Sequence, residues 1–365
     1  MKSFSSFFFF FMIITVRGQL PTETSNIEVS VFRGNIYKHA PYINHLITGH
    51  PNGVLISYNR QTYGDKEWQQ AYNFPDYGFS FQYQDFQNDI IGKNYALAAH
   101  YNFYFLRRHL LFRISQGVGM TSNPYDKLTN YRNNAFGSRL MSSNHFLLNY
   151  KKENVVGNFG IQAGFLFTHF SNGRIQSPNS GINSYALNIG VNYNLDEKQV
   201  YVRNDSLLQK DYSEPIRYNI AFRSGISESQ IVESGQQPFY HLGFYADKRI
   251  GRKSALQVGT DVFFSKYLKE YIKYTSVAYP NRPPTDPDTD YRRVGVFVGH
   301  ELFINRLSVE TQLGYYVYKP FRYECDIYQR AGLKYYFTNQ IFGGVALKAH
   351  GARAEAIEFG VGVRL

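Results

Sequence analysis

The stretch NFGIQAGFLFTHFSN, residues 158–172, carries the pattern that decides the fold. Successive side chains of a β-strand point to opposite faces, so residues two apart share a face. One face is apolar until an imidazole and a hydroxyl interrupt it, and it reads Phe159, Ile161, Ala163, Phe165, Phe167, His169 and Ser171. The other face is mostly small or polar, with Asn158, Gly160, Gln162, Gly164, Leu166, Thr168 and Phe170. The stretch therefore predicts a strand whose two sides meet different surroundings.

A second strand with the same alternation follows after a short connection. Asn183 begins its apolar face, which continues with Tyr185, Leu187, Ile189, Val191, Tyr193 and Leu195. If the loop from Gly173 to Ile182 closes a hairpin, His169, Ser171 and Asn183 come together at the loop end of an apolar surface. A base and a hydroxyl placed there would meet acyl chains.

The polar faces distinguish a membrane barrel from a soluble β-sandwich, whose core would be the apolar face. The last strand, Glu355 to Leu365, sets Ile357, Phe359 and Val361 against Glu358, Gly360 and Arg364. Charges that recur on the inner face suit a polar lumen better than a dry core. We therefore expect an all-β protein, a transmembrane antiparallel β-barrel of about 12–16 strands.

Composition agrees with a barrel. The chain holds 32 Tyr and 31 Phe, as the aromatic girdles of such barrels require. Mean hydropathy is −0.39, and no apolar run beyond the leader reaches the roughly 20 residues of a spanning helix. The net charge of +11 suits an anionic lipid surface, although surplus Lys and Arg are common in barrels of many functions.

The N-terminus predicts a secretory signal. Lys2 supplies the positive start, an apolar core follows from Phe7 to Val16, and a cleavage site precedes Gln19. We expect residues 1–18 to be the signal peptide and residues 19–365 to form a single barrel domain. Cys325 is the only cysteine, so an intrachain disulfide is excluded, and zinc or thiol chemistry lacks its residues.

The connections predict which end of the barrel faces outward. Tight links are expected at Arg107-Arg108, Lys152-Glu153, Gly251-Arg252, Asn305-Arg306 and Asn339-Gln340, all on the side of both termini. Long links near Ser122 to Ser142 and Lys266 to Arg292 fall on the opposite side, as does the loop from Gly173 to Ile182. Short periplasmic turns and long external loops are typical of the outer membrane. The segments Asp196 to Pro215 and Gln61 to Phe74 are exceptions, long although the count makes them periplasmic.

The hairpin resembles the outer-membrane lipid A 3-O-deacylases, the PagL-like family. The resemblance rests on His169-Phe170-Ser171-Asn172, followed by Pro178-Asn179-Ser180-Gly181, over about twenty residues and their flanking strands. Typical members are shorter barrels of eight strands, and they carry Glu where this chain has Asn183. The family also has a glycine where this chain has Arg174.

This resemblance implies a serine esterase. Ser171 would be the nucleophile, His169 the general base, and Asn183 would orient the imidazole without stabilising the imidazolium as a carboxylate does. We therefore expect either a slower enzyme or a different orienting group. Asn179 and Gly173 would form the oxyanion hole, and Arg174 and Asn172 would contact the substrate.

The implied substrate is lipid A of lipopolysaccharide in the bacterial outer membrane, with no cofactor and no metal. Two alternatives stay open: an esterase for phospholipids or another acylated lipid, and a non-catalytic barrel, porin-like or surface-binding, that retains the hairpin as a relic. A lumen filled by side chains would favour the enzyme over a channel. No phosphate-binding glycine loop or nucleic-acid motif is present, so nucleic acid is not an expected partner, and the oligomeric state is left open.

Overall fold

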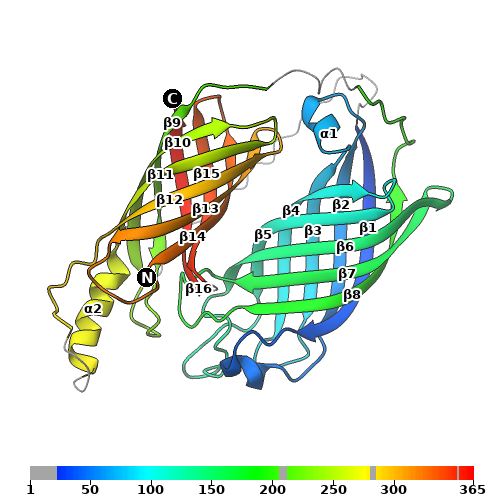
Figure 1. Ribbon diagram of the computed structural model, residues 1–365. Coiled ribbons are helices and arrows are strands. Elements are labelled where there is room, and N and C mark those ends of the chain that lie inside the picture. Colours follow the sequence, from blue (N-terminus) through cyan, green and yellow to red (C-terminus); the bar gives the residue numbers. More distant parts are fainter. Residues whose placement is uncertain (1–22, 205–211, 280–284, 352) are drawn as a thin grey trace, which may run out of the picture.

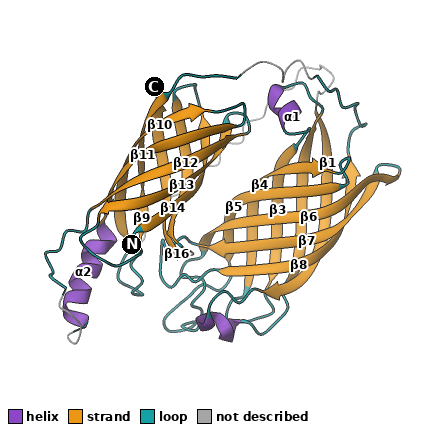
Figure 2. Cartoon of the chain, viewed as in Figure 1, coloured by secondary structure: helices purple, strands orange, loops and turns teal. Residues whose placement is uncertain are grey.

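The computed structural model describes residues 23–204, 212–279, 285–351 and 353–365 (Figure 1). The expected signal peptide, residues 1–18, lies outside this part of the chain. Sixteen antiparallel strands close into two barrels of eight strands each. Helices are few and short compared with the strands, as Figure 2 shows. Within the described residues, none is long and apolar enough to span a membrane.

The first barrel closes where β1 pairs with β8. Its strands are β1 (Glu23–Ile36), β2 (Asn52–Thr62), β3 (Asp76–Asp85), β4 (Lys93–Phe105), β5 (Leu110–Thr121), β6 (Leu140–Val156), β7 (Phe159–Ser171) and β8 (Ile182–Asn194). Two short helices lie in its connections, η1 (Pro41–Leu46) and α1 (Glu67–Ala71).

The second barrel closes where β16 pairs with β9. Its strands are β9 (Arg217–Ser227), β10 (Gln237–Arg249), β11 (Ser254–Ser265), β12 (Arg293–Phe303), β13 (Leu307–Tyr318), β14 (Ile327–Tyr336), β15 (Ile341–His350) and β16 (Arg353–Arg364). Helix α2 (Lys266–Ala278) extends beyond the strands between β11 and β12 (Figure 1).

The all-β class and the number of strands agree with the sequence analysis. The structure differs in having two barrels where a single barrel over residues 19–365 was expected. The reason lies between β8 and β9, where residues 195–216 connect the two closed sheets (Figure 1). This explains why the segment from Asp196 to Pro215 is longer than a periplasmic turn. Both barrels use the same period-2 alternation, so the sequence pattern does not show where one sheet closes and the next begins.

The connections segregate as the strand count predicts. The short turns between β4 and β5, β10 and β11, β12 and β13, and β14 and β15 lie at one end, together with α1 and the inter-barrel connection. One turn is displaced, because β6 and β7 continue past Lys152 and turn at Gly157-Asn158. The long loops, η1 and α2 lie at the other end, which is the outer end in the topology of bacterial barrels.

The lumens are filled by buried polar side chains. In the first barrel, Glu28 accepts a hydrogen bond from Arg113 at 2.5 Å and from Lys151 at 2.8 Å. In the second, Arg330 pairs with Asp261 at 2.8 Å and with Glu358 at 2.6 Å. The outer walls carry exposed apolar side chains such as Leu187 and Val361. A polar interior and an apolar exterior are the arrangement that a bilayer requires of a barrel.

An apolar cluster closes the outer mouth of the first barrel. It is built from the strand ends and loops and includes Ile36, Ile43, Leu46, Phe86, Ala135, Phe136, Phe170 and Ile182. Phe170 is 1% exposed and points inward into this cluster, so its two neighbours in β7, His169 and Ser171, are turned to the opposite face. The cluster therefore fixes the base of the hairpin that carries the site.

Candidate active site

The hairpin of β7 and β8 sets His169 directly opposite Asn183. The same register pairs Phe167 with Tyr185 and Phe165 with Leu187. Phe165 is 43% and Leu187 73% exposed on the outer wall. Because His169 shares the face of Phe165, its imidazole lies on the outside of the barrel, above an apolar strip, as the alternation predicts.

Asn183 fixes the orientation of the imidazole. The distance from His169 Nδ1 to Asn183 Oδ1 is 2.6 Å. A carboxamide oxygen can only accept, so Nδ1 carries the proton and Nε2 keeps its lone pair. Among the described residues, no hydrogen bond to Nε2 is found, so this nitrogen is available to take a proton.

The hydroxyl of Ser171 lies between two donors. The side-chain amide of Asn179 donates to Oγ at 3.0 Å, and the backbone N–H of Gly173 donates to it at 3.1 Å. The backbone N–H of Asn172 donates to Asn179 Oδ1 at 3.0 Å, which orients the amide so that Nδ2 faces the serine. Two donors thus converge on Ser171 Oγ, and both lie next to the place that an ester carbonyl oxygen would take when Oγ attacks.

Ser171 and His169 are close to each other without a direct hydrogen bond between them in this structure. Both border Gly181, where a Cβ would lie 3.2 Å from Ser171 Cβ and 3.4 Å from His169 Cε1. Gly181 has a φ of +66°, a left-handed conformation that favours glycine. Catalytic hydrogen bonds are often long in enzymes without substrate, so this geometry is compatible with a serine and base pair.

Asn172 braces the loop that follows β7. Its side chain is buried, donates to Ser138 Oγ at 2.9 Å and to Gln176 O at 2.8 Å, and accepts from the backbone N–H of Arg174 at 2.9 Å. These bonds occupy the amide within the protein, so in this structure it supports the loop instead of facing the outer surface.

Arg174 points to the second barrel. Its Nη1 lies 3.4 Å from Glu324 Oε1, and its guanidinium carbon lies 4.6 Å from the ring centre of Tyr267. Burial alone would lower the pKa of Arg174, but Tyr267 and Glu324 beside the guanidinium raise it above the ordinary arginine value. Nε and Nη2 make no hydrogen bond within the described residues, and contact with a lipid A phosphate stays a prediction.

Sequence reasoning missed the residues that shape the loop from a distance. The motif quoted from the sequence contains Gly181 but does not state its left-handed conformation, which the turn-like Asn179-Ser180 before it could have indicated. Tyr267, Glu324 and Glu228 belong to the second barrel, and no local pattern announces their contact with a loop so far away in the chain.

Comparison with known families matches each barrel separately. Residues 52–192 match the family model described as lipid A 3-O-deacylase (PagL), and this match contains β7, the loop that follows it and β8 as far as residue 192. Residues 216–365 match the model described as acyloxyacyl hydrolase, C-terminal domain. The boundary between the two matches falls in the connection between the barrels.

Comparisons with curated sequences and solved structures add little. No curated protein matches the sequence. A mutant of the Rh. blastica porin is 10% identical, with 94% of this chain and 100% of the porin covered, at a TM-score of 0.20. The Acinetobacter baumannii outer membrane protein Omp33 is 9% identical, with 94% and 99% covered, at a TM-score of 0.18. On the two family matches, the chain belongs to the lipid A 3-O-deacylase (PagL) family and is a protein of the bacterial outer membrane.

Proposed function

We propose that this protein is a serine esterase that removes an ester-linked acyl chain from lipid A of lipopolysaccharide. The observation that carries the proposal is the imidazole of His169, held by Asn183 beside Ser171 on the outer wall of the first barrel. A nucleophile at the outer rim of the apolar wall lies near the depth at which the ester bonds of an outer-leaflet lipid begin.

The first half-reaction forms an acyl-enzyme. The Ser171 hydroxyl turns from Asn179 toward His169 and gives its proton to Nε2 as Oγ bonds to the ester carbonyl carbon. The carbonyl electron pair moves to oxygen, where Gly173 N–H and the Asn179 amide stabilise the negative charge. The intermediate collapses, and His169 returns the proton to the departing sugar oxygen.

The second half-reaction releases the fatty acid. Water gives a proton to His169 and attacks the acyl carbon through the same donors, after which Ser171 leaves and recovers its proton. The site needs no further group for this cycle. Asn183 holds the imidazole in the required tautomer throughout but adds no negative charge against the imidazolium, so we expect slower turnover than a carboxylate would support.

The wall below the site offers a place for the acyl chain. Phe165, Tyr185 and Leu187 are exposed on the outer surface of β7 and β8 in adjacent register positions. An acyl chain lying along them stays in an apolar environment while its ester reaches the rim. The net charge of +11 over the whole chain suits the phosphorylated sugars of lipid A.

The filled lumens favour the esterase over a channel. Side chains lining a water-filled pore would be accessible to solvent, but Arg113 and Lys151 in the first barrel and Arg330 and Lys348 in the second are at most 1% exposed. Each forms an ion pair with a carboxylate on another strand of the same barrel. In both barrels, buried and ion-paired side chains thus occupy the lumen where porins keep a water-filled channel.

Mass spectrometry of lipid A tests the proposal. Purified, detergent-folded protein is incubated with lipopolysaccharide, and the lipid A is compared with that from a Ser171→Ala variant. Loss of one acyl chain with the native protein alone is the expected result. Unchanged lipid A together with acyl release from phospholipid vesicles would move the substrate to another lipid, and no release from either would contradict the esterase.

A further inference from the structure

The loop that carries the oxyanion donors, residues 172–181, is held in place by the second barrel. The backbone carbonyl of Arg174 accepts from Glu228 N–H at 3.0 Å and from Ser227 Oγ at 3.3 Å. Ser177 donates from its N–H to Glu228 Oε2 at 2.6 Å and from its hydroxyl to Ser229 O at 2.7 Å. Gln236 donates to Ile175 O at 3.1 Å. The connection between β9 and β10 therefore follows this loop along its length.

The donor residue itself packs on the second barrel. A Cβ at Gly173 would lie 2.3 Å from Ile357 Cγ1 and 3.5 Å from Leu347 Cδ1. Gly173 also has a φ of +61°. Its backbone N–H, which donates to Ser171 Oγ, is thus fixed by a close approach to β15 and β16 as well as by the turn.

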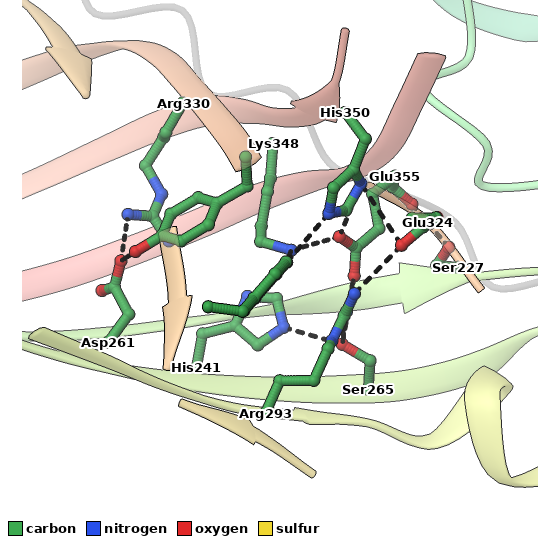
Figure 3. Close-up of polar contacts among 12 residues, drawn as sticks. Ser227, His241, Asp261, Ser265, Arg293, Glu324, Arg330, Lys348, His350 and Glu355 are labelled. Carbon is green, nitrogen blue, oxygen red and sulfur yellow. Dashed lines mark hydrogen bonds and ion pairs between the residues drawn. The ribbon is translucent and has the colours of Figure 1, made fainter. Parts of the chain in front are cut away.

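Arg174 contacts a largely buried ionic cluster through Glu324. We call this cluster, which Figure 3 shows, the socket: Arg293, Glu324, Lys348, His350 and Glu355. Glu324 lies 3.4 Å from Arg174, 3.0 Å from Arg293 and 3.2 Å from His350. Glu355 pairs with Arg293 and Lys348. The guanidinium of Arg174 enters this cluster from the other barrel.

The socket has the residue types of a metal site but not the charge. Glu324, His350 and Glu355 lie close enough to share an ion. Both carboxylates are already compensated by Arg174, Arg293 and Lys348, and these cations would oppose a metal ion at the same place. The cluster is better explained as a set of ion pairs that receives Arg174.

We propose that the second barrel is a positioning partner of the esterase site, and that Arg174 in the socket sets the oxyanion loop against Ser171. This inference rests on the proposed function. Arg174 and Glu324 are positioning residues in it, since they act through Gly173 and touch no reacting atom. The two barrels then form one catalytic unit, although only the first carries the nucleophile and base.

Kinetics with two substrates separate positioning from phosphate binding by Arg174. The variants Arg174→Ala and Glu324→Gln are assayed on lipid A and on an uncharged p-nitrophenyl acyl ester in detergent micelles. A displaced oxyanion loop lowers kcat by about 100-fold on both substrates with little change in KM, and Arg174→Lys recovers part of the loss. A higher KM for lipid A alone would assign Arg174 to the phosphate and overturn the proposal.

Glu67→Gln is the matched control. It removes an ion pair between the barrels, Glu67 with Arg252, at the end opposite the site. We expect unchanged kcat, because that contact does not reach the loop. A loss in Glu67→Gln equal to that in Glu324→Gln would mean that general association of the barrels, and not the socket, supports activity.

Hydrogen exchange gives a readout that does not depend on the reaction. In folded Glu324→Gln, amides of residues 172–181 should exchange at least several-fold faster than in the native protein, while those of β7 and β8 stay protected. Glu228→Gln, which weakens the contact with Ser177, provides a second variant if Glu324→Gln does not fold. Unchanged exchange of residues 172–181 in the folded variant would refute the proposal that the second barrel positions this loop. A different result would refute only the proposed esterase activity: the native protein leaves lipid A intact, but residues 172–181 exchange faster in the variant than in the native protein.

Discussion

The two barrels have the same architecture but different roles. Each closes eight antiparallel strands around a lumen filled by buried ion pairs, and each exposes an apolar wall. Only the first brings a histidine and a serine together on its outer rim. In the second, His241 and His350 are buried, and His300 lies on β12 with its Cα opposite Thr311. The fold therefore does not decide the chemistry, which the proposed function assigns to one hairpin and its loop.

The difference also shows what a second barrel can contribute. The outer end of the second barrel carries the socket and the connection between β9 and β10, both of which contact residues 172–181. The second barrel, whose histidine and serine pair His241 and Ser265 is buried inside the sheet, can thus still determine the geometry of a neighbouring site. The following variants compare residues of the same type in the two barrels.

The largest contrast is expected between His169→Ala and His300→Ala. Removing the base lowers kcat/KM on lipid A by about 10,000-fold, because Ser171 then has no acceptor for its proton. The corresponding change in the second barrel leaves kcat/KM unchanged. Acyl release is measured by mass spectrometry for both variants. A comparable loss in His300→Ala would place chemistry in the second barrel and remove the contrast.

Stability should respond to the loss of a lumen arginine in either barrel. Arg330→Met leaves two buried carboxylates, Asp261 and Glu358, with the more distant Arg223 at 3.6 and 3.9 Å, and should cost about 3–5 kcal/mol in the free energy of unfolding. Arg113→Met should cost less, about 1–3 kcal/mol, because Glu28 keeps Lys151. Urea unfolding in detergent measures both. Equal losses would indicate that Lys151 does not compensate Glu28.

Gly181→Ala and Gly351→Ala compare two left-handed glycines in outer loops. A Cβ at Gly181 would lie 2.9 Å from Phe170 O and crowd Ser171 and His169, whereas one at Gly351 would meet nothing within 4 Å. Their φ values, +66° and +60°, impose similar backbone strain. We expect kcat to fall about 100-fold in Gly181→Ala only. Similar activity in the two variants would mean that crowding at Gly181 is relieved by movement of the loop.

The smallest expected effect is an increase in kcat. Asn183→Glu restores a carboxylate beside His169 Nδ1, where it can stabilise the imidazolium, and should raise kcat by about 10-fold. Steady-state kinetics on lipid A measure the gain, with Asn183→Ala as the variant that lowers kcat. An unchanged kcat in Asn183→Glu would show that the missing carboxylate does not limit the rate.

The sequence predicted much of the first barrel because its signals are local. The period-2 alternation gave the faces of β7 and β8, and the hairpin register put His169 opposite Asn183. The number of barrels escaped prediction because closure depends on which distant edges pair, β1 with β8 and β9 with β16. Contacts between barrels, such as Arg174 with Glu324, have no periodicity to reveal them.

Labelling with a fluorophosphonate probe tests the central claim most directly, because the probe bonds covalently to activated serines. The folded native protein is treated with the probe, digested and mapped by mass spectrometry. A single adduct on the peptide that contains Ser171, lost in His169→Ala, is the expected result. An adduct on a serine of the second barrel, or none under conditions in which lipid A loses an acyl chain, would contradict the assignment of the nucleophile to the first barrel.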